Sequence, residues 1–177
     1  GFESLPVQVE TDVSDGMPSF DMVGFLTSEV KEARERVRTA LKNAGFRLPA
    51  KKITINLTPA DVRKSGTGCD LPMAASVLAA FGFLDEHILS SYLLLGEVGL
   101  NGSILPTKGV LSAAVLAQKE GMQGIVVPWE NAREAAILDT VKVIPVKNLK
   151  EFVQICQQEL PETCFYREQQ DFWKTEY

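Results

Sequence analysis

Apolar and polar residues alternate along the first part of the chain, with the period of two that is typical of strands. Residues 7–14, VQVETDVS, read as a half-buried strand. Asp15 and Gly16 follow as a turn, so residues 18–25, PSFDMVGF, are predicted to return as the second strand of a hairpin. Residues 51–59, KKITINLTP, are predicted to form a further strand that ends at their proline.

Between the second and third of these strands the apolar period changes to that of a helix. Thr27 or Ser28 can cap this helix, which is expected to run to about Ala44 and to stop at Gly45. Its apolar residues recur three or four positions apart and predict one buried stripe: Val30, Ala33, Val37, Ala40, Leu41 and Ala44.

The second half of the chain alternates predicted helices and strands. The helices cover about residues 71–83, 108–120 (ended by Gly121), 130–138 and 149–160. The strands are 91–99, a short partner strand SILP after an Asn101-Gly102 turn, 124–128 and 141–146. This order predicts an α/β fold with a mixed sheet covered by helices over residues 1–160, and residues 161–177 read as a linker.

Length and composition exclude several classes of protein. The 177 residues suffice for one domain with a sizeable core, and no apolar run reaches the roughly 18 residues of a membrane span. The N-terminus has neither a signal-peptide pattern nor an initiator Met, so we expect a cytoplasmic domain excised from a longer protein. Cys69, Cys156 and Cys164 form no C-x-x-C pair, which favours a reducing compartment over a zinc site. A single histidine, His87, argues against a His-based triad.

Charge is distributed unevenly along the chain. The net charge is −5, but ten basic and four acidic residues lie between Glu29 and Lys64, so that this window carries +6 and the remainder −11. Such a block bears on the partners of a protein rather than on its fold.

Basic residues line one face of the first predicted helix. Lys31, Arg34, Arg38 and Lys42 fall at i, i+3, i+7 and i+11. Arg63 and Lys64 precede a glycine-rich loop. These six residues are the candidates for contact with nucleic-acid phosphates, which basic stripes bind without reading sequence. The alternative is a solvated face neutralised by the i, i+4 pairs Glu32–Arg36 and Lys31–Glu35.

Residues 66–81, GTGCDLPMAASVLAAF, lead from a glycine-rich loop into an apolar helix. A tight turn before a helix N-terminus is a common way to present a nucleophile, because the helix dipole favours negative charge there. The candidate position holds Met73, whose thioether has no proton to lose.

Two stretches resemble the proteolytic domain of Lon-type ATP-dependent proteases. Residues 70–75, DLPMAA, are similar to the D-G-P-S-A-G of that family, whose Ser is the nucleophile. Residues from Gly96, GEVGLNGSILPTKGVLSAA, are similar to G-E-x-x-L-x-G-x-V-L-P-x-G-G-L-K-E-K, whose first Lys is the general base. The resemblance implies that Met73 and Leu111 occupy the two dyad positions, that this dyad is degenerate, and that the two side chains meet in one place or share an apolar patch.

A longer resemblance covers nearly the whole chain. Four segments, beginning VETDVSDGMPSF, EVKEARERVRTAL, KKITINLTPADV and LLLGEVGLNG, are similar to the N-terminal domain of Mg-chelatase-like AAA+ ATPases, the ComM/YifB family. It implies a Lon-protease-like fold of the ribosomal-protein domain-2 type, a pseudo-protease without a cofactor of its own. It further implies an AAA+ ATPase module after residue 177 that binds ATP and magnesium, a homo-oligomeric ring, expected to be a hexamer, and a role on DNA in competence or recombination.

Two other functions stay open at this point. Ser76 lies one helical turn after Met73, and Lys108 lies three residues before Leu111, so a rearranged Ser–Lys peptidase site is one alternative. A subunit of a magnesium-chelating enzyme is the other. Neither glycine-containing loop, 66–69 or 102–109, has the Gly-Lys-Ser/Thr order of a phosphate loop, so no ATP binding is expected in this segment.

Overall fold

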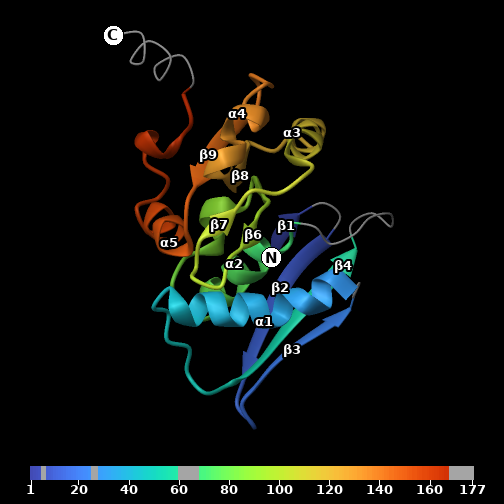
Figure 1. Ribbon diagram of the computed structural model, residues 1–177, viewed down its shortest axis with the longest axis vertical. Helices are drawn as coiled ribbons and strands as arrows, with labels where there is room; N and C mark the ends of the chain where they lie inside the picture. Colours follow the sequence, from blue (N-terminus) through green and yellow to red (C-terminus); the bar gives the residue numbers. More distant parts are fainter. Residues whose placement is uncertain (5–6, 25–27, 60–67, 168–177) are drawn as a thin grey trace.

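The computed structural model describes residues 1–4, 7–24, 28–59 and 68–167. Within them, five α-helices accompany a four-stranded sheet, a three-stranded sheet and a two-stranded hairpin. Figure 1 shows α1 lying across the strands of the four-stranded sheet, with the three-stranded sheet and helices α3, α4 and α5 in the other half of the molecule. The expected α/β class with a mixed, helix-covered sheet is therefore confirmed.

The four-stranded sheet contains both parallel and antiparallel pairs. Its strands are β1 (Phe2–Ser4), β2 (Val7–Ser14), β3 (Ser19–Gly24) and β4 (Lys52–Pro59), in the order β1-β2-β4-β3. β4 runs antiparallel to β2 and parallel to β3.

The predicted hairpin of residues 7–14 and 18–25 is wrong. Both segments are strands, but β4 lies between them and pairs with each. Helix α1 (Ser28–Asn43) joins β3 to β4 and supplies the crossover that parallel neighbours require. β4 also carries three buried residues in alternation, Ile53, Ile55 and Leu57, which suit a central strand.

Two helices cover the apolar side of this sheet. α1 buries the predicted stripe of Val30, Ala33, Val37, Ala40 and Leu41, and ends before Gly45, whose φ is +94°. α2 (Asp70–Ala80) starts close to its predicted position and is buried from Asp70 to Leu78. A helix that is apolar on all sides belongs in a core, and α2 contacts β1, β2, α1 and β6.

The three-stranded sheet is parallel and covered on both faces. It consists of β5 (Tyr92–Leu94), β8 (Gly124–Pro128) and β9 (Lys142–Val146), in the order β5-β8-β9. Ile125 and Val127 face the apolar cluster beneath α3 (Val110–Lys119) and α4 (Ala132–Ala135), whereas Val126 faces the cluster that includes α5 (Leu149–Gln157). Continuous apolar strands are typical of such doubly covered sheets.

The predicted strand 91–99 is divided in two. β5 stops at Leu94, and β6 (Glu97–Val98) pairs instead with β7 (Ile104–Leu105) around the predicted Asn101-Gly102 turn. The break lies at Gly96, whose N–H donates to Gly68 and whose carbonyl accepts from Leu71. The backbone of Gly96 is therefore hydrogen-bonded to the turn before α2 and leaves the strand ladder.

Three 3₁₀ turns complete the described fold: η1 (Glu86–Leu89), η2 (Trp129–Asn131) and η3 (Glu162–Cys164). After α5 the chain reverses through Glu159 and Leu160, whose φ angles are +58° and +55°. Residues 161–167 then lie against the domain, with Cys164 buried and the Tyr166 N–H donating to Val143. The boundary at residue 160 and the linker beyond it stay predictions, and residues 168–177 lie outside the described part.

The described helices include none with the length and apolar character needed to cross a membrane.

Candidate functional site at the junction of α1 and α2

An ion pair with a buried carboxylate joins the two helices that cover the four-stranded sheet. Arg36 of α1 donates from Nε to Asp70 Oδ2 at 2.8 Å and from Nη2 to Asp70 Oδ1 at 2.9 Å. The side chain of Asp70 is only 3% exposed, and its Oδ2 also accepts from the Val98 backbone N–H at 3.0 Å. One carboxylate thus binds α1, the start of α2 and the β6–β7 hairpin.

Electrostatics keep Arg36 in its charged form. Its hydrogen bonds to Asp70 raise the pKa of Arg36, and the negative charges of Asp70, Glu97 and Glu32 act in the same direction against the effect of burial. A bidentate guanidinium–carboxylate pair is fixed in orientation as well as in distance. The pair therefore sets how α1 lies relative to α2.

The turn before α2 is packed too tightly for any side chain at Gly68. Its φ is +84°, and a Cβ there would lie 2.6 Å from Leu95 Cδ1 and 3.6 Å from Thr107 Oγ1. Thr107 is buried beside this turn. Its backbone N–H donates a hydrogen bond to Asn131 Oδ1. At Gly68, the last glycine of the glycine-rich loop, the left-handed backbone and the close approach of Leu95 therefore favour glycine.

The two proposed dyad positions lie in different surroundings. Met73 is fully buried in the large apolar cluster around α2. Leu111, in the first turn of α3, is 37% exposed and belongs to neither apolar cluster. Met73 therefore lies in the core, while Leu111 keeps a water-facing side. That the two side chains meet or share an apolar patch stays a prediction. Their origin as dyad positions stays a prediction.

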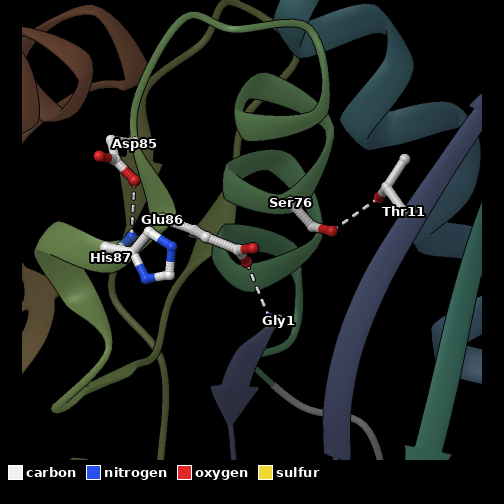
Figure 2. Close-up of polar contacts among 6 residues, drawn as sticks. All are labelled: Gly1, Thr11, Ser76, Asp85, Glu86 and His87. Atoms are coloured by element: carbon white, nitrogen blue, oxygen red, sulfur yellow. Dashed lines mark hydrogen bonds and ion pairs between the residues drawn. The ribbon is translucent and has the colours of Figure 1, made fainter.

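Ser76 does not meet Lys108. Figure 2 shows Ser76 on α2 pointing toward Thr11 of β2, and the two hydroxyl oxygens are 2.7 Å apart. Lys108 is exposed in the turn that precedes α3, and no hydrogen bond joins it to Ser76 in the described part of the chain. A Ser–Lys site needs that contact to activate the serine, so the geometry does not support the rearranged peptidase.

Beside Ser76 lies an acidic pocket of about 420 Å³, lined by residues of β2, α2 and η1 that include Glu10, Asp12, Asp85, Glu86 and His87. Three of its carboxylates have partners within the domain. Asp12 accepts from Asn56 Nδ2 at 3.2 Å, and Figure 2 shows the other two. Asp85 accepts from the His87 backbone N–H at 3.0 Å, and Glu86 binds the amino group of Gly1 at 2.8 Å. The described residues contain no group of three or more His, Cys, Asp or Glu side chains placed to hold a metal ion.

The basic residues of α1 lie on its outer side. Lys31, Arg38 and Lys42 are exposed, and the side chain of Arg34 is 43% exposed. Arg63 and Lys64 lie outside the described residues. The buried stripe and the Arg36–Asp70 pair together fix the rotation of α1, so the four described cations face away from the sheet.

The ion pairs expected to neutralise this face differ from those observed. Glu35 lies 3.6 Å from Arg34 and 3.8 Å from Arg38, and Arg36 turns to Asp70. The predicted pairs Glu32–Arg36 and Lys31–Glu35 are absent from the ion pairs of the described residues. The reason is that Arg36 lies on the α2 side of α1, within reach of a buried carboxylate that binds it in two places.

Sequence reasoning did not single out Arg36 and Asp70. The available signal was an acidic residue at the first position of a helix whose following residues are apolar except for Ser76. A charge at the start of so apolar a helix needs a partner once buried.

Comparisons with known proteins agree with the longer of the two resemblances. A sequence profile of the family described as subunit ChlI of Mg-chelatase matches residues 9–131. The chain is 45% and 46% identical to the uncharacterised YifB proteins of Salmonella typhimurium and Escherichia coli, and 43% identical to the competence protein ComM of Haemophilus influenzae. Each alignment spans 113 residues, which is 64% of this chain and 22% of the relative. The chain therefore spans about a fifth of the length of these relatives.

Proposed function

Because the chain belongs to the family of the Mg-chelatase subunit ChlI, we propose that it is a non-catalytic accessory domain of a ring-forming ATPase that acts on DNA. In this proposal the domain binds the DNA backbone, and ATP and magnesium are bound by an AAA+ module elsewhere in the full-length protein. The similarity to a competence protein supports a role on DNA.

The observation that carries the proposal is the outward basic face of α1. Lys31, Arg34, Arg38 and Lys42 gather on one side of a single helix, although the chain as a whole is negative. Segregated positive charge is what lets an acidic protein approach a polyanion. These long side chains offer phosphate contacts without base readout, so the expected binding is independent of sequence.

Binding by a single domain is expected to be weak. Glu35 lies among the four cations and contacts two of them, which lowers the net charge of the face. In a ring, several copies of the face act on one DNA molecule, and multivalency raises the overall affinity without new contacts. The full-length assembly is therefore the form in which the function is tested.

The test replaces Lys31, Arg38 and Lys42 with Glu in the full-length protein and measures DNA affinity across a salt series. Arg34 is left intact because it is less exposed than the other three residues. The matched control replaces three other exposed lysines, Lys108, Lys119 and Lys150, with Glu and so changes the net charge by the same amount.

For a single domain, about four phosphate contacts give a slope of log affinity against log salt near −3 to −4, and the full-length parent is expected to show a steeper slope because several domains contact one DNA molecule. The α1 variant is expected to lose binding while the control retains most of it. Equal loss in both variants would show that only net charge matters, and unchanged binding by the α1 variant would remove α1 from the interface.

The proposal that this domain lacks peptidase activity rests on the same architecture. The resemblance to Lon-type proteases assigns Met73, which has no ionisable group, to the position of the nucleophile. Ser76 is hydrogen-bonded to Thr11 rather than to a base. We interpret the turn before α2 as retained architecture whose present purpose is packing.

A further inference from the structure

A groove of about 580 Å³ lies on the opposite side of the three-stranded sheet from α3. Its walls are the end of β9, one side of α5 and the returning segment 161–167, and Trp129 stands at its edge. The apolar part of the lining comes from Trp129, Pro145, Ile155, Pro161 and Phe165. The volume falls within the range of functional binding clefts.

The charged groups around this groove are already paired within the domain. Glu162 binds Arg167 at 2.9 Å, and Glu151 accepts from the Lys147 backbone N–H at 2.9 Å. The ammonium of Lys147 lies over the Trp129 ring, 4.3 Å from its centroid. What the groove offers to a partner is therefore mainly apolar and aromatic surface.

Trp129 is the least covered part of that surface. It is 52% exposed, and it belongs to the short turn η2 directly after β8. Lys147 holds one face of the ring, so the indole has a fixed direction without being buried. An exposed, oriented aromatic beside an apolar groove is typical of a contact surface.

The length of the relatives supports an occupant from the same polypeptide. The chain spans only 22% of the length of its relatives, so most of each relative is made of residues that this chain does not include. A domain within one polypeptide forms interfaces with its neighbours, and those interfaces bury apolar surface of this kind.

We infer that this groove is the docking surface for the remaining part of the full-length polypeptide, which inserts an uncharged apolar segment against Trp129, Ile155 and Phe165. The inference rests on the proposed place of the chain within a longer protein, but it needs neither ATPase activity nor DNA binding. Since the carboxylates of the groove are occupied, the inserted segment contributes aliphatic or aromatic side chains rather than cations.

Hydroxyl-radical footprinting with residue-level mass spectrometry tests the inference by comparing the 177-residue chain with the full-length protein. Oxidation of Trp129 and Phe165 is expected to fall by about fivefold in the full-length protein, because the centre of an interface is desolvated. Met17, 84% exposed in the turn between β2 and β3, is the internal control and is expected to react equally in both.

A Trp129→Ala variant of the full-length protein supplies the second arm, in which Phe165 is expected to regain most of its reactivity. Equal oxidation of Trp129 in the two parent proteins overturns the inference. Protection that disappears on dilution also overturns it, since the occupant is then a second copy. The DNA affinity of the same preparations, measured separately, shows whether the proposed function stands when the groove inference fails.

Discussion

The carboxylate of Asp70 accepts two hydrogen bonds from the guanidinium of Arg36, at 2.8 and 2.9 Å, across the boundary between α1 and α2. Arg36 is the one basic residue of α1 with a bidentate partner among the described residues. The helix that carries the proposed DNA-binding face is thus tied to the core through a side chain that is not part of that face.

Arg36→Ala is expected to destabilise the domain strongly. The substitution leaves the Asp70 carboxylate buried, and among the described residues it keeps one hydrogen bond, from Val98. Removing one partner of a fully buried pair costs about 3 kcal/mol or more, and because Arg36 is one third exposed, we expect a loss of about 2–3 kcal/mol. Urea unfolding followed by circular dichroism measures the change in the free energy of unfolding.

The control for this prediction is Arg38→Ala on the exposed side of the same helix. Its contact with Glu35 spans 3.8 Å at the surface, so the free energy of unfolding is expected to change by less than about 0.5 kcal/mol. If both variants unfold at the same urea concentration, the Arg36–Asp70 pair does not hold the helices together.

Met73→Ser restores the residue type of the proposed ancestral nucleophile but is not expected to restore peptidase activity. Met73 is fully buried, so the substitution removes packed atoms and buries a hydroxyl, at a cost of about 3–5 kcal/mol. Hydrolysis of a fluorescent casein measures activity, and thermal unfolding measures stability.

Met17→Ser provides the matched comparison, because Met17 is exposed and its loss is expected to leave the midpoint of unfolding nearly unchanged. Casein cleavage by the Met73→Ser variant above the level of the parent would contradict the inward placement of this side chain.

Stability is expected to fall in alkaline solution because buried thiols resist ionisation. Burial raises the pKa of Cys156 to about 12, and the nearby Cys164, whose own pKa rises to about 11, adds to the shift. Because the thiol ionises less readily in the folded than in the unfolded protein, the folded state is fully stable only below the pKa of the unfolded state. That stability is lost as the pH rises from about 9 toward 12.

At pH 10 the contribution lost through Cys156 alone is about 1 kcal/mol. A Cys156→Ala variant is therefore expected to show a flatter decline of unfolding free energy between pH 9 and pH 11 than the parent. Ser112→Ala, an exposed substitution on α3, controls for unrelated effects. Identical slopes in all three proteins would mean that Cys156 ionises equally in the folded and unfolded states.

Glu159→Gly is expected to stabilise the domain. Glu159 has a φ of +58° directly after α5, in the left-handed region that costs an L-residue about 1 kcal/mol or more. Glycine is favoured at this position after a helix, so the midpoint of thermal unfolding should rise by about 2–4 °C. Differential scanning calorimetry gives the shift.

Gln158→Gly tests the specificity of that effect. Gln158 has a φ of −88°, where glycine brings no relief of strain, so no gain is expected. A similar increase in both variants would point to a cause other than the positive φ of Glu159.

Most elements could be predicted from local pattern, while their partners could not. The alternation in residues 7–14 gives a strand with the observed bounds, and the stripe from Val30 to Leu41 gives the buried side of α1. The order of strands depends on which strand pairs with β2. In this fold α1 returns the chain so that β4 lies between β2 and β3. A turn signal such as Asp15-Gly16 does not carry that information.

The candidate site was predictable to a similar degree. Helical spacing placed Lys31, Arg38 and Lys42 on an exposed face, and it also placed Arg36 on the same helix without indicating its partner. Asp70 lies 34 positions away, and only tertiary packing brings its carboxylate to the guanidinium. A motif match likewise carries no information about exposure: Leu111, matched without a gap, is 37% exposed in the first turn of α3.

The position of β4 between β2 and β3 has a consequence for how the chain folds during synthesis. β2 and β3 do not pair with each other in the native sheet, because each of them pairs with β4, residues 52–59. The native sheet therefore cannot form until α1 and β4 have both left the ribosome. Until then, β2 and β3 lack the strand with which they pair in the folded domain. Such non-local pairing slows folding and lengthens the exposure of strand edges.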